Sequence, residues 1–250
     1  LDPQARKTLQ AASVIGRSFY YKILNDVNHT LGISGNRLDR ELLLLQRSDI
    51  IRETARFPEL EYTFSHSLTQ EAAYNTLLFK QRREYHLYVG EAIERLFTER
   101  LEEFHPILAY HFQAAKDPRA LQYERLSGDD ALRLYALPVA ADHYRKALDL
   151  ALENIEEVDT ETLRHIYLRL GRVYELQAEP KQALDLYDEM KERASEWEND
   201  RLKLAALAAQ GTLLSIPTPN QYPEAAQKIS IQALELALKL VDRKAEAKIL

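Results

Sequence analysis

A short pattern of small and aromatic residues recurs in the second half of the chain, and it constrains the fold more than any other feature. Its clearest copy reads Tyr167-x-x-Leu170-Gly171-x-x-Tyr174, followed by Ala183-x-x-x-Tyr187. Gly171 and Ala183 are small and stand twelve residues apart (171 to 183), so each falls on one helix of a predicted hairpin. Two helices can approach closely at such residues, while the large side chains fill the seam around them.

Two further copies surround this one. Gly128 is followed by Ala140 after the same twelve residues, and Gly211 is followed by Ala226 after fifteen. The longer third step contains residues 215–220, which read as a loop because they include two prolines. The pattern resembles tetratricopeptide repeats, although the glycines lie 43 and 40 residues apart (128 to 171 to 211), against a usual period of about 34. We therefore predict an α-solenoid of helical hairpins with extra residues between the hairpins.

Proline marks the predicted helix starts. It is tolerated in the first turn of a helix and disfavoured in the interior. Apolar-periodic runs begin at the dipeptides Asp2-Pro3, Asp117-Pro118, Leu137-Pro138, Glu179-Pro180 and Tyr222-Pro223. Asp2 and Asp117 are predicted N-caps. No alternating β-branched run follows residue 66, so we expect only helices from there onward.

The first 65 residues do not repeat. Residues 2–15, 20–31 and 34–48 read as helices, the third with Leu38, Leu42 and Leu45 on one face. Residues 50–53 and 60–64 read as two short strands joined around Pro58. Three helices followed by a small β-hairpin is the order of a winged-helix domain.

Winged helices often bind DNA through their third helix. The predicted third helix carries Arg37, Arg40 and Arg47, but it also carries acidic residues and a run of four leucines over 42–45. This mixture favours packing against protein over reading a DNA groove. The basic cluster Lys80-Gln-Arg82-Arg83 is interpreted as a solvated helix face.

Composition narrows the function classes. The net charge is −6, which argues against general nucleic-acid binding, and the absence of cysteine excludes disulfides and thiolate metal ligands. With 46% apolar residues the chain can bury a core. No apolar run approaches a membrane span and no signal-peptide pattern opens the chain, so we expect a cytoplasmic protein without a membrane partner. The apolar last residues and the missing initial methionine suggest a piece of a larger protein, with more repeats beyond residue 250.

Two segments resemble the region that follows the nucleotide-binding module in signal-transduction ATPases of the STAND class. One is Ala11-Ala-Ser-Val-Ile-Gly16-Arg-x-Phe19, and the other is Phe64-x-His66-x-Leu68-x-Gln70-Glu71-x-x-Tyr74. The pattern is most similar to bacterial proteins in which a cyclase or kinase domain precedes an AAA-like ATPase and a long repeat array. The resemblance covers residues 5–150 and implies a winged helix followed by helical repeats.

The same resemblance suggests a role for His66. In related ATPases the histidine between the last strand of the winged helix and the next helix contacts the β-phosphate of ADP, in a Met-His-Asp motif. Here the motif reads Ser65-His66-Ser67. Ser67 and Gln70 form a capping-box pattern, so His66 is expected just before a helix N-terminus, where an anion is favoured. The alternative is a structural histidine that is hydrogen-bonded at the end of a strand.

No catalytic constellation is present in the sequence. A phosphate-binding Gly-x-x-x-x-Gly-Lys-Ser/Thr loop is missing, and no two histidines stand three or four residues apart as a metal-binding helix face would need. We therefore expect no enzyme activity and no cofactor in this chain. ADP or ATP would bind an upstream module of the parent protein.

These observations lead to one preferred interpretation. A winged-helix-like domain over residues 1–100 would relay the state of the upstream nucleotide-binding module in cis. Helical repeats over residues 104–250 would bind a protein or peptide partner. The candidate binding residues, which would suit an acidic peptide, are Arg164, His165, Arg169 and Arg172. Two alternatives are a DNA-binding transcriptional regulator with inducer-sensing repeats and a scaffold that assembles into homo-oligomers.

Overall fold

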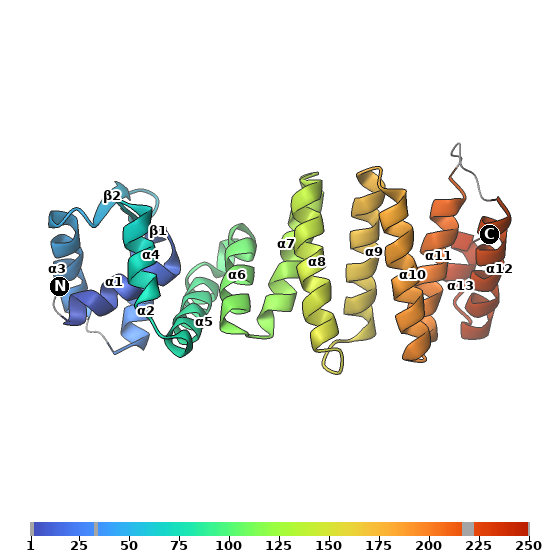
Figure 1. Cartoon of the computed structure of the whole chain (residues 1–250), viewed down its shortest axis with the longest axis horizontal. Helices are drawn as coiled ribbons and strands as arrows, with labels where there is room; N and C mark the ends of the chain where they lie inside the picture. The colour runs from blue at the N-terminus through green and yellow to red at the C-terminus, as the bar shows by residue number, and fades with distance from the viewer. Residues whose placement is uncertain (1–2, 33–34, 217–222, 250) are drawn as a thin grey trace. The chain divides into compact units, whose positions relative to one another are not determined.

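The computed structural model describes residues 3–32, 35–216 and 223–249, which fold into two compact units (Figure 1). The first unit comprises residues 1–123 and the second residues 124–250. The described residues are mainly α-helical with one small sheet, as the sequence predicts. The predicted boundary at residues 100–104 falls inside the first unit, because the helix at residues 105–115 packs against the helices at residues 79–96 and 98–104. Repeat membership of those helices stays a prediction.

The first unit begins with three helices and a three-stranded sheet. The helices are α1 (Pro3–Ile15), α2 (Tyr21–Thr30) and α3 (Gly35–Arg47), and the strands are β1 (Ser18–Tyr20), β2 (Ile51–Ala55) and β3 (Glu61–Phe64). After the sheet follow α4 (Ser67–Asn75), α5 (Phe79–Leu96), the 3-10 helix η1 (Thr98–Phe104) and α6 (His105–Ala115). The helix α7 (Arg119–Arg133) runs from the first unit into the second. The predicted helices and the β2–β3 hairpin are confirmed.

The strand β1 was not predicted. The sheet order is β1-β3-β2 with antiparallel pairs, so β3 is central and β1 forms one edge. The sequence pattern predicts a helix that starts at Tyr20, whereas Tyr20 ends β1 and α2 begins at Tyr21. A strand of three residues carries no periodicity of its own, because its pairing with β3 decides its conformation.

The core of the first unit follows the predicted helix faces. Leu38, Leu42 and Leu45 are buried, whereas Leu43 and Leu44 of the same run are 53% and 47% exposed. The predicted core residues of α1 are also buried: Ala5, Leu9, Ala12 and Val14. Helical periodicity therefore predicted which leucines face the interior.

The second unit consists of helices that pack in sequence order. After α7 come α8 (Leu137–Glu153), α9 (Thr160–Leu176), α10 (Pro180–Glu196), α11 (Asp200–Leu214), α12 (Pro223–Leu240) and α13 (Arg243–Ile249). Among these, α9 packs against α8 and α10, and α11 against α10 and α12. The predicted proline starts are confirmed where the residues are described. Asp117 accepts a hydrogen bond from the backbone N–H of Arg119, as predicted for a cap, and Asp2 lies outside the described residues.

The close approach within the hairpins is made by aromatic rings of the predicted seam, which lie directly over the glycines. A Cβ added to Gly171 would lie 2.3–2.4 Å from the ring end of Tyr187, four residues after Ala183. Gly128 lies against the ring of Tyr144 in the same way, at 2.8 Å. In the third hairpin Gly211 faces Ser230, with 3.1 Å to its Oγ, because the insertion shifts the register by three residues. Both tyrosines are almost fully buried, so they fill the seam between the helices.

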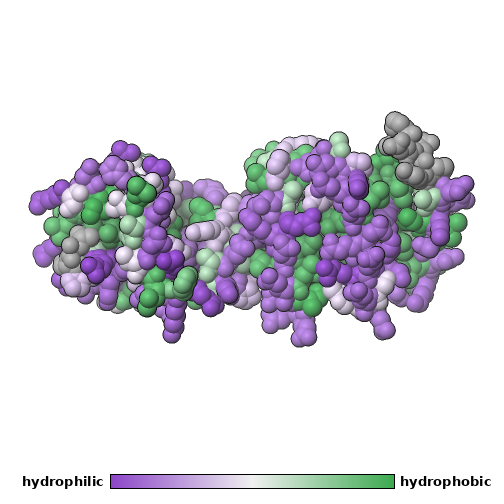
Figure 2. Space-filling view, in the orientation of Figure 1, coloured by the Kyte–Doolittle hydropathy of each residue, from purple (hydrophilic) through white to green (hydrophobic). Residues whose placement is uncertain are grey.

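Hydrophilic side chains cover much of the visible face of the second unit (Figure 2). Apolar side chains gather at the end of the α7–α8 hairpin, where Leu134 and Tyr135 are 78% and 73% exposed. No helix in the described part of the chain is both long and apolar enough to cross a membrane.

Candidate functional site

His66 lies between β3 and α4, as the sequence analysis predicts. It is the N-cap residue of α4, with extended backbone angles (φ −131°, ψ 133°). Its carbonyl oxygen accepts hydrogen bonds from the backbone N–H groups of Thr69 and Gln70, at 3.1 and 3.4 Å. These bonds fix the backbone of His66 but do not involve its side chain.

The imidazole of His66 is exposed and makes no capping hydrogen bond. The described residues include no hydrogen-bond partner for its ring, in contrast to the structural histidine that was the alternative. The predicted capping box is wrong, because Ser67 is the first helical residue and Gln70 binds elsewhere. The Gln70 side chain donates to the carbonyl oxygen of Ser13 at 2.6 Å, which ties α4 to α1. His66 is therefore open to a ligand or to another protein surface.

The surroundings of His66 combine an anion-binding helix terminus with one nearby carboxylate. The first backbone N–H groups of α4 have no partner within the helix, and the helix dipole adds partial positive charge there. Ser65 donates its hydroxyl to Asp49 Oδ1 at 3.1 Å, and its backbone N–H binds the carbonyl oxygen of Ile50. The negative charge of Asp49 opposes the binding of an anion at this helix terminus.

The four basic residues predicted to bind protein all lie on α9 and all have acidic partners. Arg164 pairs with Glu161, and Arg172 Nη1 lies 2.8 Å from Glu175 Oε2. The side chains of Arg164 and His165 are 39% and 29% exposed, and those of Arg169 and Arg172 are 50% and 57% exposed. The positive charge of this set is therefore reduced, and Arg169 and Arg172 offer most of what remains.

Asp129 of α7 is the carboxylate that two of these residues share. His165 Nε2 lies 3.1 Å from Asp129 Oδ1, and Arg169 Nε lies 3.7 Å from the same oxygen. The hydroxyl of Tyr144 donates a hydrogen bond to Asp129 at 2.6 Å. The pKa of Tyr144 is raised mainly by burial and to a smaller extent by the Asp129 carboxylate. Arg125 contacts Asp129 as well, at 3.3 Å. This cluster holds α7, α8 and α9 in register.

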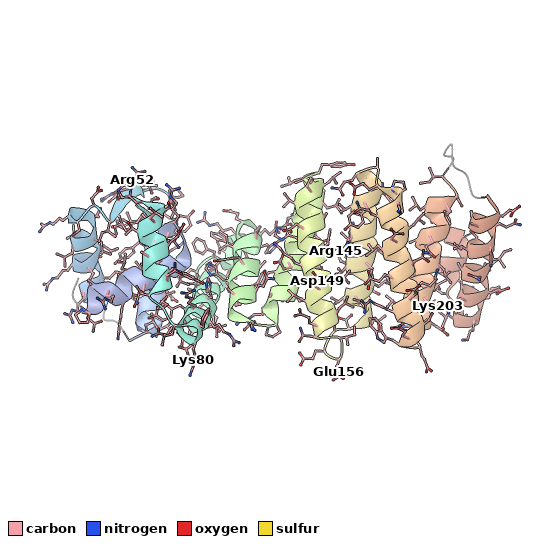
Figure 3. The ribbon with its side chains drawn as sticks, in the orientation of Figure 1. Arg52, Lys80, Arg145, Asp149, Glu156 and Lys203 are labelled. Atoms are coloured by element: carbon pink, nitrogen blue, oxygen red, sulfur yellow. The ribbon has the colours of Figure 1, made fainter. Side chains whose placement is uncertain are left out.

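A second contact joins neighbouring hairpins. Arg145 of α8, labelled in Figure 3 together with Asp149, donates to the hydroxyl of Tyr174 at 2.5 Å. Tyr174 belongs to the sequence motif on α9. The motif tyrosine therefore contributes both apolar surface and a hydrogen bond between hairpins.

Two buried histidines form a polar cluster that the sequence analysis missed. His86 Nδ1 lies 2.8 Å from His111 Nδ1, and His86 Nε2 lies 3.1 Å from the hydroxyl of Tyr74. Burial, with a smaller effect of Arg82, lowers the pKa of His86 to about 4. Burial and the neighbouring His86 lower the pKa of His111 to about 3, although the Ile15 backbone opposes this shift. Both rings are therefore neutral near pH 7, and one donates to the other. They stand 25 residues apart on α5 and α6, so no local pattern could indicate the pair.

The basic cluster at residues 80–83 is only partly the predicted solvated face. Lys80, labelled in Figure 3, is solvent-exposed. Arg82 Nε, however, donates to the carbonyl oxygen of Leu77 at 3.0 Å, and its guanidinium lies 4.6 Å from the centre of the Tyr74 ring. Arg82 is thus a structural residue at the α4–α5 turn.

The exposed face of α3 has the mixed character predicted from its sequence. Arg37, Arg40 and Arg47 are exposed, together with Leu43 and Leu44. Asp39 on the same helix accepts a hydrogen bond from the hydroxyl of Tyr21 at 2.9 Å. Across the described residues, no group of three or more acidic or histidine side chains could hold a metal ion.

Comparison with known proteins gives no family for this chain. Neither a protein-family model nor a curated protein matches it.

Proposed function

We propose that the chain is a regulatory part of a larger signalling ATPase. The first unit acts as a winged-helix-like relay of nucleotide state, and the second unit acts as a tetratricopeptide-like surface for a protein partner. The observation that carries this proposal is the exposed imidazole of His66, which has no capping bond and stands at the start of α4. A side chain held at that position without a structural partner suits contact with another module.

The element order of the first unit supports the winged-helix part of the proposal. Three helices, with β1 between α1 and α2, precede the β2–β3 hairpin, and β1 pairs with β3. The last strand then leads directly through His66 into α4. A change at the nucleotide would therefore reach α1 through the bond from Gln70 to Ser13.

The experiment for this role is a measurement of ADP affinity in the longer protein that includes the ATPase module. We expect His66→Ala to weaken ADP binding on the order of tenfold, which corresponds to about 1.4 kcal/mol. His29→Ala is the matched control, because His29 is also exposed and lies near the end of α2. Equal ADP affinity of the folded His66→Ala protein and the wild type would reject the sensing role.

The second unit is proposed to bind a protein partner through the α9 face. Its two most exposed cations, Arg169 and Arg172, suit an acidic peptide. Charge reversal of both residues to glutamate should abolish partner capture, while Arg201→Glu on the exposed surface of α11 should not. Unchanged capture after the double reversal would remove the α9 face from the proposal.

A further inference from the structure

The first unit contains a cavity of about 330 Å³ at the edge of the sheet. It lies within the range of volumes typical of small-molecule sites, near the lower end. Its walls come from α1, β1, α2, β3, α5, η1 and α6. The apolar side chains among its lining residues include Ile15, Tyr20, Ile23, Ile93, Phe104 and Ile107.

One wall of this cavity is aromatic. Tyr20 and Phe104 both line it, with their rings edge to face at a centroid distance of 6.5 Å. The ring of Phe97 packs against that of Phe104, with 4.1 Å between the ring centroids. Phe104 is 5% exposed and Tyr20 is half-buried, so the phenol ring is accessible to a ligand. The face of an aromatic ring attracts cations through its quadrupole.

The cavity is also lined by two carboxylates, Glu61 and Glu103. Glu61 pairs directly with Tyr20 in the β1–β3 register, so their side chains lie on the same face of the sheet. The described residues include no ion-pair partner for the Glu61 carboxylate. Glu103 is 62% exposed and lies 4.0 Å from Arg100, which is closer to Glu59, at 3.3 Å. The charge of the lining is therefore negative.

We propose that this cavity binds a small organic cation with an apolar body. The cationic group would lie between Glu61 and the ring of Tyr20, and the apolar body would contact the isoleucines. An anion would be repelled by both carboxylates. A neutral ligand would remove water from the Glu61 carboxylate without supplying a partner, which costs binding free energy. The site is separate from His66, and the proposal does not depend on nucleotide sensing.

The test is isothermal titration calorimetry of the full chain with three probes of similar shape. They are 2-phenylethylammonium, neutral 2-phenylethanol and anionic 3-phenylpropionate. We expect the cation to bind with a dissociation constant on the order of 1 mM, as suits a ligand of this size, and about tenfold more tightly than the neutral probe. Equal binding of the cation and the alcohol, or no binding of the cation, would overturn the proposal.

Variants then locate the site. Glu61→Gln should weaken binding of the cation about tenfold, whereas Glu71→Gln, at an exposed position of α4, should leave it unchanged. Ile107 is 43% exposed, so Ile107→Trp can fill the cavity without burying a new side chain completely, and it should abolish binding. If Glu61→Gln does not fold, Glu103→Gln at its more exposed position replaces it. Equal losses in Glu71→Gln and Glu61→Gln would show a general charge effect and reject the site.

Discussion

Replacement of Gly171 by alanine should destabilise the α9–α10 hairpin. The new Cβ would meet the Tyr187 ring at 2.4 Å and its hydroxyl oxygen at 2.3 Å, well inside van der Waals contact. Tyr187 is 2% exposed and donates its hydroxyl to Glu175 at 2.9 Å, so the ring cannot move into solvent without losing both burial and this bond.

The change in the free energy of unfolding follows from one stabilising and two destabilising contributions. Alanine is favoured over glycine in a helix by about 0.8–1 kcal/mol. Overpacking of a filled core costs about 1–3 kcal/mol, and loss of a hydrogen bond to a charged group costs about 1.5–3 kcal/mol. If the ring shifts enough to weaken that bond only in part, the free energy of unfolding falls by about 2 kcal/mol.

The matched control is the same substitution in the third hairpin. At Gly211 the nearest atom to an added Cβ is Ser230 Oγ at 3.1 Å, and this small side chain can rotate. Gly211→Ala should therefore be neutral or stabilising by up to about 1 kcal/mol, because only the helix propensity changes. The same substitution is thus expected to lower the free energy of unfolding at Gly171 and not to lower it at Gly211.

Trp197 provides the assay. It is the only tryptophan of the chain and the C-cap residue of α10, the helix that carries Tyr187. Urea unfolding followed by its fluorescence reports on this hairpin. With a slope of about 2 kcal/mol per M, a loss of about 2 kcal/mol lowers the midpoint by about 1 M. In a Tyr187→Leu background, Gly171→Ala should lose most of its cost, since the clashing ring is gone. A wild-type midpoint for Gly171→Ala would refute the reasoning.

Two further predictions concern buried polar groups of the first unit. The folded pKa values of His86 and His111 lie below the ordinary value of 6.5, so their contribution to stability is complete above pH 6.5. The free energy of unfolding falls as the pH decreases toward about 4 for His86 and about 3 for His111, by up to about 1.4 kcal/mol per pH unit for each ring. Urea unfolding at several pH values should show this slope, and a variant with both rings replaced by glutamine should show a smaller one; equal slopes would contradict the assignment. Glu41 is 4% exposed and accepts a hydrogen bond from the hydroxyl of Thr8. Thr8→Val should therefore lower the free energy of unfolding by about 1.5–3 kcal/mol. An unchanged melting temperature would contradict this and show that another donor replaces the hydroxyl.

The helices could be predicted because their signals are local. Proline in the first turn indicates where α8 and α10 begin. The helical periodicity of α3 distinguishes the buried Leu42 from the exposed Leu43. The β2–β3 hairpin was also predicted from short alternating runs. These signals depend on residues that are close in the sequence, so the secondary structure of these segments depends little on tertiary contacts.

The features that the sequence did not reveal are set by pairing between distant elements. β1 is a strand because β3 lies beside it, and the ring that lies directly over Gly171 is that of Tyr187 rather than the methyl group of Ala183. Gln70 fits a capping box by its spacing, yet the nearby carbonyl oxygen of Ser13 is a better partner in the folded protein. For Tyr20 and Gln70, a local preference competed with a tertiary contact and lost.

The histidines show what this distinction means for function. His86 and His111 are buried and bonded to each other, so their replacement would change the stability of the fold. His66 is exposed, and its ring has no capping bond, so its removal should leave the fold intact. A loss of ADP affinity in His66→Ala could then be attributed to contact with the nucleotide, since a damaged core would not accompany it. The lack of internal partners that makes His66 dispensable for stability is the same property that makes it suited to contact another module.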